Sequence, residues 1–412
     1  MRVLAIIGFG LILLFAGSCC PCPNGTISHP LLNPAPDLPA CDDVEVVTSI
    51  PSETNLHHAG TRSAAIVWAE MIKKAASSIC LEEFYLTGKA GGALEPVVRE
   101  ILNAAQRGVK VRILTSDSMA ANSEELIQRF SHSPNIEILL FDWKQLNNGG
   151  LHAKFFIVDG KEAFIGSQNF DWRALEHIHE TGLRIGCQPV VSALERIFEA
   201  DWAFHAGRTD AYLRLKDQTP IRFHEDLFLV SSPPDLNPPG VRSAIDTLVA
   251  LIDGAKKKIT VQLLSYHTDM RGSDERYYRI DTALRRAAGR GVDVKMLISD
   301  WNKRKPRVDD VKELALQPGI QVKFVTIPEH SSGFIPYSRV IHSKVMRVDD
   351  QISWVGTSNW AHSYFYTSRN VEVVARLPKI AKILDQLFLS LWNSEYAYTV
   401  DPQEDYIPPK TH

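Results

Sequence analysis

The chain has 412 residues, 45% of them hydrophobic, with 45 basic and 48 acidic side chains and a formal net charge of −3. This length is sufficient for one large core or two ordinary ones, and the composition excludes a fibrous or largely disordered protein. A polyanionic partner has to be met by a local basic patch, because the molecule as a whole does not attract one.

The first 18 residues predict an export signal. Arg2 precedes an apolar run from Val3 to Gly17 that is too short to cross a bilayer comfortably. "AGSCC" resembles a bacterial lipobox, in which Cys19 becomes the lipidated first residue, although Ala16 stands where such signals usually carry Leu. An uncleaved signal anchor is the alternative. Both readings predict an exported protein that is membrane-anchored or periplasmic.

Residues 19–40 predict a Pro-rich tether. Asn24 begins a glycosylation sequon, which has meaning only in a eukaryotic secretory pathway. In an exported protein Cys41 and Cys187 can pair, since each lies outside the apolar runs, whereas Cys80 is expected to be a buried thiol.

The rest of the chain contains an internal repeat. "AAQRGVKVRILTSD" from Ala104 matches "AAGRGVDVKMLISD" from Ala287, an offset of 287 − 104 = 183. "IKKAASSICLEEFYL" from Ile72 matches "IDGAKKKITVQLLSY" from Ile252, an offset of 252 − 72 = 180. Strands that alternate with amphipathic helices predict an α/β fold. We therefore expect two duplicated α/β sandwich lobes with mixed sheets, residues 41–230 and 231–412, about a pseudo-twofold axis with one active site at their interface.

Local patterns agree with this architecture. "GALEPVVREILNAAQRG" has apolar residues at helical spacing and predicts a helix that stops at Gly108. "VKVRIL" and "VDVKMLI" are rich in β-branched residues and predict strands.

The most specific signal is a motif that occurs once in each half. Both copies follow H-x-K, four residues, D, six residues, G-[ST]-x-N. The matched residues are His152, Lys154, Asp159, Gly166, Ser167 and Asn169 in the first copy, and His342, Lys344, Asp349, Gly356, Thr357 and Asn359 in the second. Six matched positions at identical spacing make a chance match implausible.

Strand periodicity gives the motif a geometry. "HAKFFIV" and "HSKVMRV" predict strands, so His and Lys at i and i+2 project from one face. The chain then turns at Asp159-Gly160 and returns along a second strand, which brings Ser167 and Asn169 back toward the His/Lys end. Asp159 and Asp349, near the turns, are expected to brace the loops rather than perform chemistry.

Two histidines, two lysines, two asparagines and paired hydroxyls that converge across a twofold predict a metal-free phosphodiester site, with no cofactor. Lysine ammoniums and amides suit phosphate oxygens, and Asn169, Asn359, Ser167 and Thr357 are the expected phosphate-binding side chains. One neutral imidazole attacks phosphorus, and the other protonates the leaving alkoxide and then serves as base for water. Lys154 and Lys344 stabilise the equatorial oxygens. A bell-shaped pH–rate profile follows.

A nucleophilic imidazole also needs a partner for its second nitrogen. Glu180 lies 11 residues after Asn169 and Glu372 lies 13 after Asn359, each in or beside an apolar strand. These two carboxylates are the candidate orienting residues, and solvent-exposed strand ends are the alternative interpretation.

The two motifs resemble the duplicated "HKD" motif of the phospholipase D superfamily. "IPYSRVIHSK", "GTSNW", "GSQNFDWRAL", "IFEADW" and "VVTSIP" further resemble the lysosomal phospholipase D-like 5′-exonucleases of animals, over a stretch from about Cys41 to Asn393. The resemblance implies a two-lobed α/β fold, one active site at the lobe interface, no metal requirement and a covalent phosphohistidine. It also implies His152 as nucleophile and His342 as acid.

The same resemblance supports a Cys41–Cys187 disulfide, because those relatives have disulfides that join equivalent regions. They tend to lose the aspartate of the second motif, which this chain keeps as Asp349. Both motifs are thus complete, which argues against an inactive scaffold. The lipobox-like start suggests a bacterial version and conflicts with lysosomal residence.

Superfamily membership leaves the substrate open. A 5′-exonuclease on single-stranded nucleic acid needs cations and aromatic platforms, and "WNKRKPR" from Trp301 to Arg307 offers both, unless it is simply a solvated loop. A phospholipase D or transphosphatidylase, acting on phospholipid head groups, fits a membrane-tethered protein. A non-catalytic phosphate-binding module is the third hypothesis, and the two intact histidines argue against it.

Four further residues have weaker signals. His177 and His179 are expected at the surface or behind the site rather than on a metal. Trp172 and Trp360, which follow the two asparagines, are expected to pack against the site wall. The sequence predicts no oligomeric state.

Overall fold

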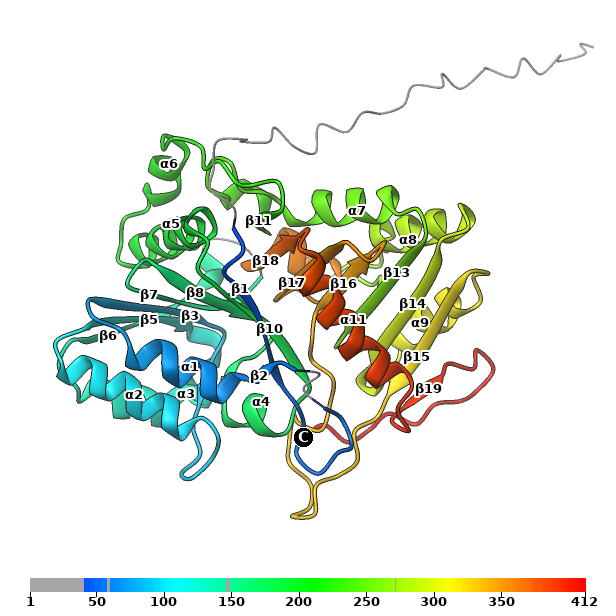
Figure 1. Cartoon of the computed structure of the whole chain (residues 1–412), viewed down its shortest axis with the longest axis horizontal. Helices are drawn as coiled ribbons and strands as arrows, with labels where there is room; N and C mark the ends of the chain where they lie inside the picture. The colour runs from blue at the N-terminus through cyan, green and yellow to red at the C-terminus, as the bar shows by residue number, and fades with distance from the viewer. Residues whose placement is uncertain (1–40, 58–59, 146–148, 271) are drawn as a thin grey trace, which may run out of the picture. The chain divides into compact units, whose positions relative to one another are not determined.

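The computed structural model describes residues 41–57, 60–145, 149–270 and 272–412 (Figure 1). The predicted export signal, the tether, Cys19 and the sequon at Asn24 lie outside these residues. Within the described ranges, no helix has the length and apolar character needed to cross a membrane.

The first half of the chain forms an eight-stranded sheet in the order β2-β1-β10-β8-β7-β3-β5-β6. β3, β5 and β6 run parallel to one another, whereas β7, β8, β10 and β1 pair in antiparallel fashion, so the sheet is mixed. The strands are β1 (Val44–Ser49), β2 (Arg62–Ser63), β3 (Ser78–Glu83), β5 (Lys110–Ser116), β6 (Ile136–Phe141), β7 (Lys154–Val158), β8 (Glu162–Gly166) and β10 (Glu180–Ile185). A small separate sheet pairs β4 (Leu86–Thr87) with β9 (Phe170–Asp171).

The second half repeats this sheet in the order β12-β11-β18-β17-β16-β13-β14-β15, with β19 added at the edge. Its strands are β11 (Leu227–Ser232), β12 (Arg242–Ser243), β13 (Lys258–Leu263), β14 (Asp293–Ser299), β15 (Ile320–Val325), β16 (Val345–Val348), β17 (Ile352–Gly356), β18 (Asn370–Ala375) and β19 (Ala397–Thr399). The predicted duplicated α/β architecture with mixed sheets is confirmed. The boundary predicted between residues 230 and 231 falls inside β11, which belongs to the second sheet.

Helices cover the sheets, and Figure 1 shows α1, α2 and α3 on one side of the first sheet with α5 on the other. The predicted helix before Gly108 is α2, which buries Val97, Val98 and Ile101 against the core. Gly108 has φ 94°, a left-handed conformation that ends the helix and favours glycine. The helices are α1 (Ala64–Lys73), α2 (Glu95–Gln106), α3 (Ala120–Ser131), α4 (Trp172–Glu176), α5 (Gln188–His205), α6 (Ala211–Lys216), α7 (Ala244–Gly254), α8 (Arg279–Gly289), α9 (Arg307–Ala315), α10 (His362–Tyr366) and α11 (Pro378–Trp392).

The two halves share one hydrophobic core. Phe155 and Leu183 of the first sheet belong to the same buried cluster as Val355 and Val373 of the second. The closing helices reach across as well, because α5 contacts β11 and α11 contacts β1. The two motif-bearing sheets are therefore packed against each other.

A disulfide joins Cys41 to Cys187, with the Cα atoms 5.2 Å apart. It links the segment that precedes β1 to the N-terminus of α5, and the two cysteines are 146 positions apart in the sequence. Cys80 is a buried free thiol.

Candidate active site

Each motif is built as a histidine followed by a β-hairpin. His152 precedes β7, Lys154 is the first residue of β7, and the chain turns at Asp159 (φ 53°) and Gly160 (φ 61°) into β8. Two consecutive positive φ angles define the type I′ turn that matches the twist of paired strands. The second motif repeats this arrangement between β16 and β17, with Asp349 at φ 52°.

The motif aspartates bind the backbone and do not face the site. The carboxylate of Asp159 accepts hydrogen bonds from the N–H groups of residues 76–78, at 2.7–2.9 Å. Asp349 accepts in the same way from residues 256–258, at 2.7–3.0 Å. Each aspartate thus fixes its hairpin to the turn that precedes β3 or β13, the bracing geometry expected from the sequence.

Each histidine is attached to the other half of the chain. The backbone N–H of His152 donates to the carbonyl of Arg369 at 3.0 Å, and that of His342 donates to the carbonyl of His179 at 2.8 Å. The two pairs obey one offset, since 342 − 152 = 190 and 369 − 179 = 190. The contacts are therefore related by the pseudo-twofold, and neither half completes the site alone.

The imidazoles are oriented across the same boundary. Nδ1 of His342 lies 2.9 Å from both carboxylate oxygens of Glu180, the first residue of β10. Nδ1 of His152 lies 2.8 Å from the carboxamide oxygen of Asn370, the first residue of β18. Because Nδ1 is occupied in both rings, Nε2 is the atom that each histidine can offer to a substrate.

Glu372 does not have the role expected for it. It lies two residues beyond Asn370 on β18, about 7 Å further along the strand. Its carboxylate accepts a hydrogen bond from the hydroxyl of Ser358, and burial raises its pKa to about 8. Adding the repeat offset of 190 to the position of Glu180 gives Asn370. The repeat therefore identifies the orienting partner of His152, whereas the distance from Asn359 had pointed to Glu372.

Ser167 and Thr357 also differ from the expectation that they bind phosphate. Ser167 donates its hydroxyl hydrogen to Glu180 at 2.5 Å, and Thr357 donates to the carboxamide oxygen of Asn370 at 2.9 Å. Both side chains are fully buried. A hydroxyl has a single hydrogen to donate, so in this structure these residues hold the orienting side chains in place, and their contact with phosphate stays a prediction.

The motif lysines are buried beside their own histidines. Nζ of Lys154 donates to the carbonyl of His152 at 2.7 Å, and Nζ of Lys344 donates to the carbonyl of His342 at 2.6 Å. Burial lowers the pKa of Lys154 to about 7 and that of Lys344 well below its usual value, because desolvation disfavours the ammonium. A nearby anion favours the charged form of an ammonium, so a bound phosphate would raise both pKa values again.

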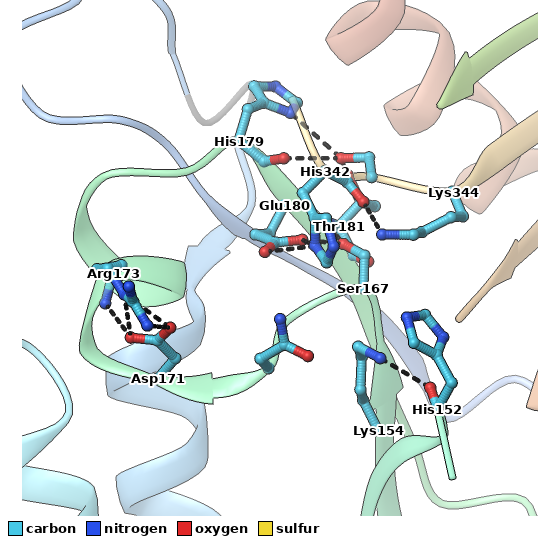
Figure 2. Close-up of polar contacts among 12 residues, drawn as sticks. His152, Lys154, Ser167, Asp171, Arg173, His179, Glu180, Thr181, His342 and Lys344 are labelled. Carbon is cyan, nitrogen blue, oxygen red and sulfur yellow. Dashed lines mark hydrogen bonds and ion pairs between the residues drawn. The ribbon is translucent and has the colours of Figure 1, made fainter. Parts of the chain in front are cut away.

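Burial also lowers the pKa of both histidines well below 6.5, and the neighbouring Lys154 and Lys344 lower it further. His342 contributes electrostatically to the shift of His152, as expected for two imidazoles in one site. Burial raises the pKa of Glu180 to about 7, against the opposing effect of Lys344. Figure 2 shows the two imidazoles and the two lysines gathered in one place.

Asn169 and Asn359 each lie three residues beyond the returning strands β8 and β17. Asn169 and Asn359 are 7% and 2% exposed, and neither carboxamide oxygen has a hydrogen-bond partner among the described residues. The amide of Asn169 donates to the hydroxyl of Tyr85 at 3.2 Å. Their contact with phosphate stays a prediction.

A cavity of about 540 Å³ opens beside His152. Its wall includes His152, Phe84, Met270, His362 and Tyr364. The ring of His152 lies 5.2 Å from Phe84 and 4.9 Å from Tyr364, measured between ring centroids. A cavity of about 610 Å³ beside the Cys41–Cys187 disulfide is remote from this chemistry.

The basic loop from Trp301 to Arg307 is engaged by the protein's own C-terminal segment. Lys303 lies over the rings of Tyr398 and Tyr406, at 5.2 and 5.6 Å from the centroids. Arg304 donates to the carbonyl of Pro409 and the hydroxyl of Thr411. A role for this loop in nucleic-acid binding stays a prediction.

The other aromatic and histidine residues are structural neighbours of the site. Trp360 is 1% exposed, whereas Trp172 is half-buried with Lys89 4.1 Å from its ring centroid. His177 and His179 are buried rather than at the surface, and Nδ1 of His179 lies 3.2 Å from the hydroxyl of Ser343. Across the described ranges, no three His, Cys, Asp or Glu side chains are grouped as metal ligands.

Comparisons with known proteins agree with this construction. Residues 68–202 and 248–392 each match the family model described as "Cardiolipin synthase, PLD-like domain". The chain is 30% identical to the 5′-3′ exonuclease PLD3 of Rattus norvegicus, over 98% of this chain and 90% of that protein. It is 29% identical to Phospholipase D Z of Dictyostelium discoideum, over 87% of this chain and 90% of that protein.

Among solved structures, the fold is similar to that of the phosphatidylserine synthase of Haemophilus influenzae Rd KW20. The TM-score is 0.61 at 10% identity, over 82% of this chain and 85% of that one. Both halves of the chain match the family model, and both carry a complete histidine–lysine motif. The chain therefore belongs to the phospholipase D superfamily of phosphodiesterases.

Proposed function

We propose that the protein is a metal-independent phosphodiesterase that acts through a phosphohistidine, and that its substrate is single-stranded nucleic acid, degraded from the 5′ end. The observation that carries the chemistry is the crossed pair of imidazoles. Each is oriented through Nδ1 by a residue of the opposite half, at 2.8–2.9 Å, and each has a buried lysine bound to its carbonyl.

The reaction proceeds in two displacements. Nε2 of one histidine attacks phosphorus in line, and the other histidine donates its Nε2 proton to the leaving alkoxide. Water then enters, loses its proton to the second histidine and breaks the phosphorus–nitrogen bond. Lys154 and Lys344 face the charge on the phosphoryl oxygens in both steps, and their burial strengthens that attraction.

The nucleic-acid substrate is supported by similarity and by the shape of the site. The relative from Rattus norvegicus, 30% identical over 98% of this chain, is a 5′-3′ exonuclease. The cavity beside His152 is lined by Phe84, His362 and Tyr364, and aromatic rings are the side chains on which unpaired bases stack. A volume of about 540 Å³ suits a single nucleoside.

Phospholipid is the second candidate substrate. It is favoured by the 29% identity to Phospholipase D Z of Dictyostelium discoideum. In that reaction a head-group alcohol takes the place of the leaving nucleotide, and a transphosphatidylase replaces water by another alcohol. The same two histidines perform both reactions.

The exported location belongs to the same proposal. The Cys41–Cys187 disulfide is typical of an oxidising compartment. The apolar run from Val3 to Gly17 supplies the signal, and Cys19 is the candidate lipid anchor. The mass of the mature N-terminal peptide tests this, since a diacylated Cys19 and a plain cleaved end differ by the mass of the lipid.

Parallel assays on both substrates test the activity. Labelled single-stranded DNA and phosphatidylcholine vesicles are incubated with the protein in EDTA, and with His152→Ala, His342→Ala and the surface control His132→Ala. Release of mononucleotides from linear DNA, with circular single-stranded DNA left intact, is the expected result, and both active-site variants abolish it while the control retains it. Turnover of lipid alone would overturn the nuclease proposal.

A further inference from the structure

The two orienting side chains differ in kind, although they occupy equivalent positions. Glu180 carries a carboxyl group and accepts a hydrogen bond from the hydroxyl of Ser167 at 2.5 Å. Asn370 carries a carboxamide whose Nδ2 donates to the carbonyl of Tyr364 at 2.8 Å. That bond fixes the amide orientation, so the carboxamide oxygen faces His152 and accepts from Nδ1–H. One imidazole thus has an ionisable partner and the other has a neutral one.

We propose that this asymmetry assigns the roles: His342, backed by Glu180, is the nucleophile, and His152, backed by Asn370, is the general acid and base. The assignment rests on the proposed phosphodiesterase function and reverses the one that the family resemblance implies. Glu180 and Asn370 are then positioning residues that distinguish the two halves of a pseudosymmetric site.

The charge on the covalent intermediate is the first argument. When Nε2 bonds to phosphorus while Nδ1 keeps its proton, the imidazole ring becomes a cation for the lifetime of the intermediate. The Glu180 carboxylate, 2.9 Å from Nδ1 of His342, balances that cation or accepts its proton. The carboxamide of Asn370 has no charge and cannot accept a proton, so the same intermediate on His152 lacks a counterion.

The position of the cavity is the second argument. His152 lies in the wall of the cavity of about 540 Å³, together with Phe84 and Tyr364, whereas His342 does not line it and is 8% exposed. The general acid has to face the leaving group, and afterwards the incoming water, so it needs open space in front of it. The nucleophile needs room for the phosphoryl group alone. His152, which faces the cavity, is therefore the better placed of the two histidines to act as the general acid.

Protonated His152 does not need a carboxylate partner. It has to carry a proton while the substrate is bound, and the substrate phosphate is itself an anion within the site. Once the alkoxide has taken that proton and left, His152 is neutral, which is the state required of a base. A neutral partner such as Asn370 suits both stages, because it holds the ring without favouring the charged form.

Two displacements make up the reaction, with His342 as the nucleophile and His152 as the acid and then the base. The Nε2 lone pair of His342 forms the bond to phosphorus, the bond from phosphorus to the leaving oxygen breaks, and that oxygen takes the Nε2 proton of His152. Next, Nε2 of His152 removes a proton from water, the water oxygen bonds to phosphorus, and the electron pair of the phosphorus–nitrogen bond returns to His342. The protein ends in its starting protonation state.

The direct test maps the phosphorylated histidine in the unaltered protein. The probe is bis(4-nitrophenyl) phosphate, which is neither a nucleotide nor a lipid, and the reaction is quenched in alkali within its first turnover. The attack expels one 4-nitrophenolate and leaves a 4-nitrophenyl phosphoryl group on nitrogen, which peptide mass spectrometry is expected to place on His342. A phosphoryl group on His152 together with turnover would overturn the assignment and leave the proposed function standing. Absence of both adduct and turnover would overturn the proposed function, and the assignment with it.

A matched pair of variants tests the positioning residues. Both Glu180→Gln and Asn370→Ala are expected to lower steady-state turnover. The two variants are expected to differ in the rate of the first step, which is measured as the burst of 4-nitrophenolate. This leaving group departs without a proton, so the first step needs the nucleophile but not the general acid. The burst rate falls about tenfold or more in Glu180→Gln and less than about threefold in Asn370→Ala. The reverse ranking contradicts the assignment, and the mapping experiment remains decisive if either variant fails to fold.

Discussion

Nδ1 of His342 lies 2.9 Å from the carboxylate of Glu180, a residue 162 positions earlier that belongs to the other half of the chain. Nδ1 of His152 has the equivalent contact, at 2.8 Å, with Asn370. The duplication therefore does not give two independent sites. Each half supplies one of the two imidazoles. Each half also supplies the side chain that orients the imidazole of the opposite half.

Removal of either histidine is expected to lower phosphodiester turnover by about 10³-fold or more, because each is required in both displacements. The double variant His152→Ala/His342→Ala is expected to lose little more than the worse single variant, since the two rings act as a unit. Initial rates on single-stranded DNA measure this, with His132→Ala as the control for an exposed histidine. Additive losses in the double variant would indicate separate sites.

The pH dependence follows from the buried cations. Burial lowers the pKa of Lys154 to about 7, so its ammonium is charged below that pH and neutral above it. Phosphate binding, and with it kcat/KM, is expected to fall as the pH rises through about 7. On the acidic side burial raises the pKa of Glu180 to about 7, so the carboxylate that faces His342 becomes protonated as the pH falls, and activity is expected to decline there as well.

Lys154→Arg separates this effect from others, because a guanidinium stays charged in this range. The variant is slower overall, and the fall in kcat/KM near pH 7 is expected to become shallower, while Lys344, whose pKa burial also lowers, continues to lose its charge as the pH rises. Lys161→Met, at an exposed lysine on the same hairpin, is the control and leaves the profile unchanged. A wild-type profile that stays flat from pH 7 to 9 contradicts the argument.

A buried ion pair supports the site from behind. Arg369, whose carbonyl accepts from the backbone of His152, binds Asp201 of α5 through two hydrogen bonds of 2.8 Å, and both side chains are fully buried. Arg369→Met leaves the Asp201 carboxylate unpaired and is expected to lower the free energy of unfolding by about 3–5 kcal/mol. Urea denaturation measures this.

The exposed ion pair of Arg214 and Asp210 is the matched control. Arg214→Met is expected to leave the unfolding free energy nearly unchanged, because solvent screens that pair. The double variant Arg369→Met/Asp201→Asn is expected to lose less than the sum of its single variants. Strict additivity would mean that the buried pair is not coupled.

The motif aspartates are expected to affect stability more than catalysis. Asp159→Ala leaves three backbone N–H groups without their acceptor, at a cost of about 1–2 kcal/mol of unfolding free energy, while kcat/KM changes less than tenfold. Thermal unfolding and initial rates check both statements, with exposed Asp217→Ala as the control. A large loss of kcat/KM at unchanged stability would show that Asp159 has a chemical role.

The same residue gives a pH effect on stability. Partial burial raises the pKa of Asp159, but hydrogen bonds from the N–H groups of residues 76–78 outweigh it and lower the pKa to about 2. A carboxyl group with a depressed folded pKa stabilises the fold above its unfolded value, near 4, and that contribution is lost as the pH falls toward 2. Asp159→Ala should therefore show a weaker loss of stability between pH 4 and 2 than the unaltered protein.

The sequence predicted the features that local periodicity and the repeat express. The duplicated α/β lobes, the hairpin after each histidine and the backbone contacts of Asp159 follow from strand alternation and turn chemistry. Glu180 was identified because it is a carboxylate at the start of an apolar strand. Asn370 was missed, since nothing in its local sequence distinguishes an orienting amide from a capping one.

The remaining differences between expectation and structure concern contacts between neighbouring strands. Ser167 and Thr357 looked like phosphate ligands because they follow the motif glycines, but each lies opposite the start of β10 or β18 and bonds the orienting residue there. Glu372 is two residues too far along β18 to reach His152. Which side chain meets which across a sheet depends on register, and the sequence of one strand does not state the register of its neighbour.

A crystal structure with orthovanadate would show whether both histidines flank a single phosphorus position, because vanadate adopts the five-coordinate geometry of the phosphoryl transition state. One vanadate per chain is expected, with Nε2 of His342 and Nε2 of His152 on opposite sides of the same vanadium atom and the lysine ammoniums on its equatorial oxygens. Vanadate bound by a single histidine, with the other imidazole in a different, solvent-filled cleft, would contradict a shared active site.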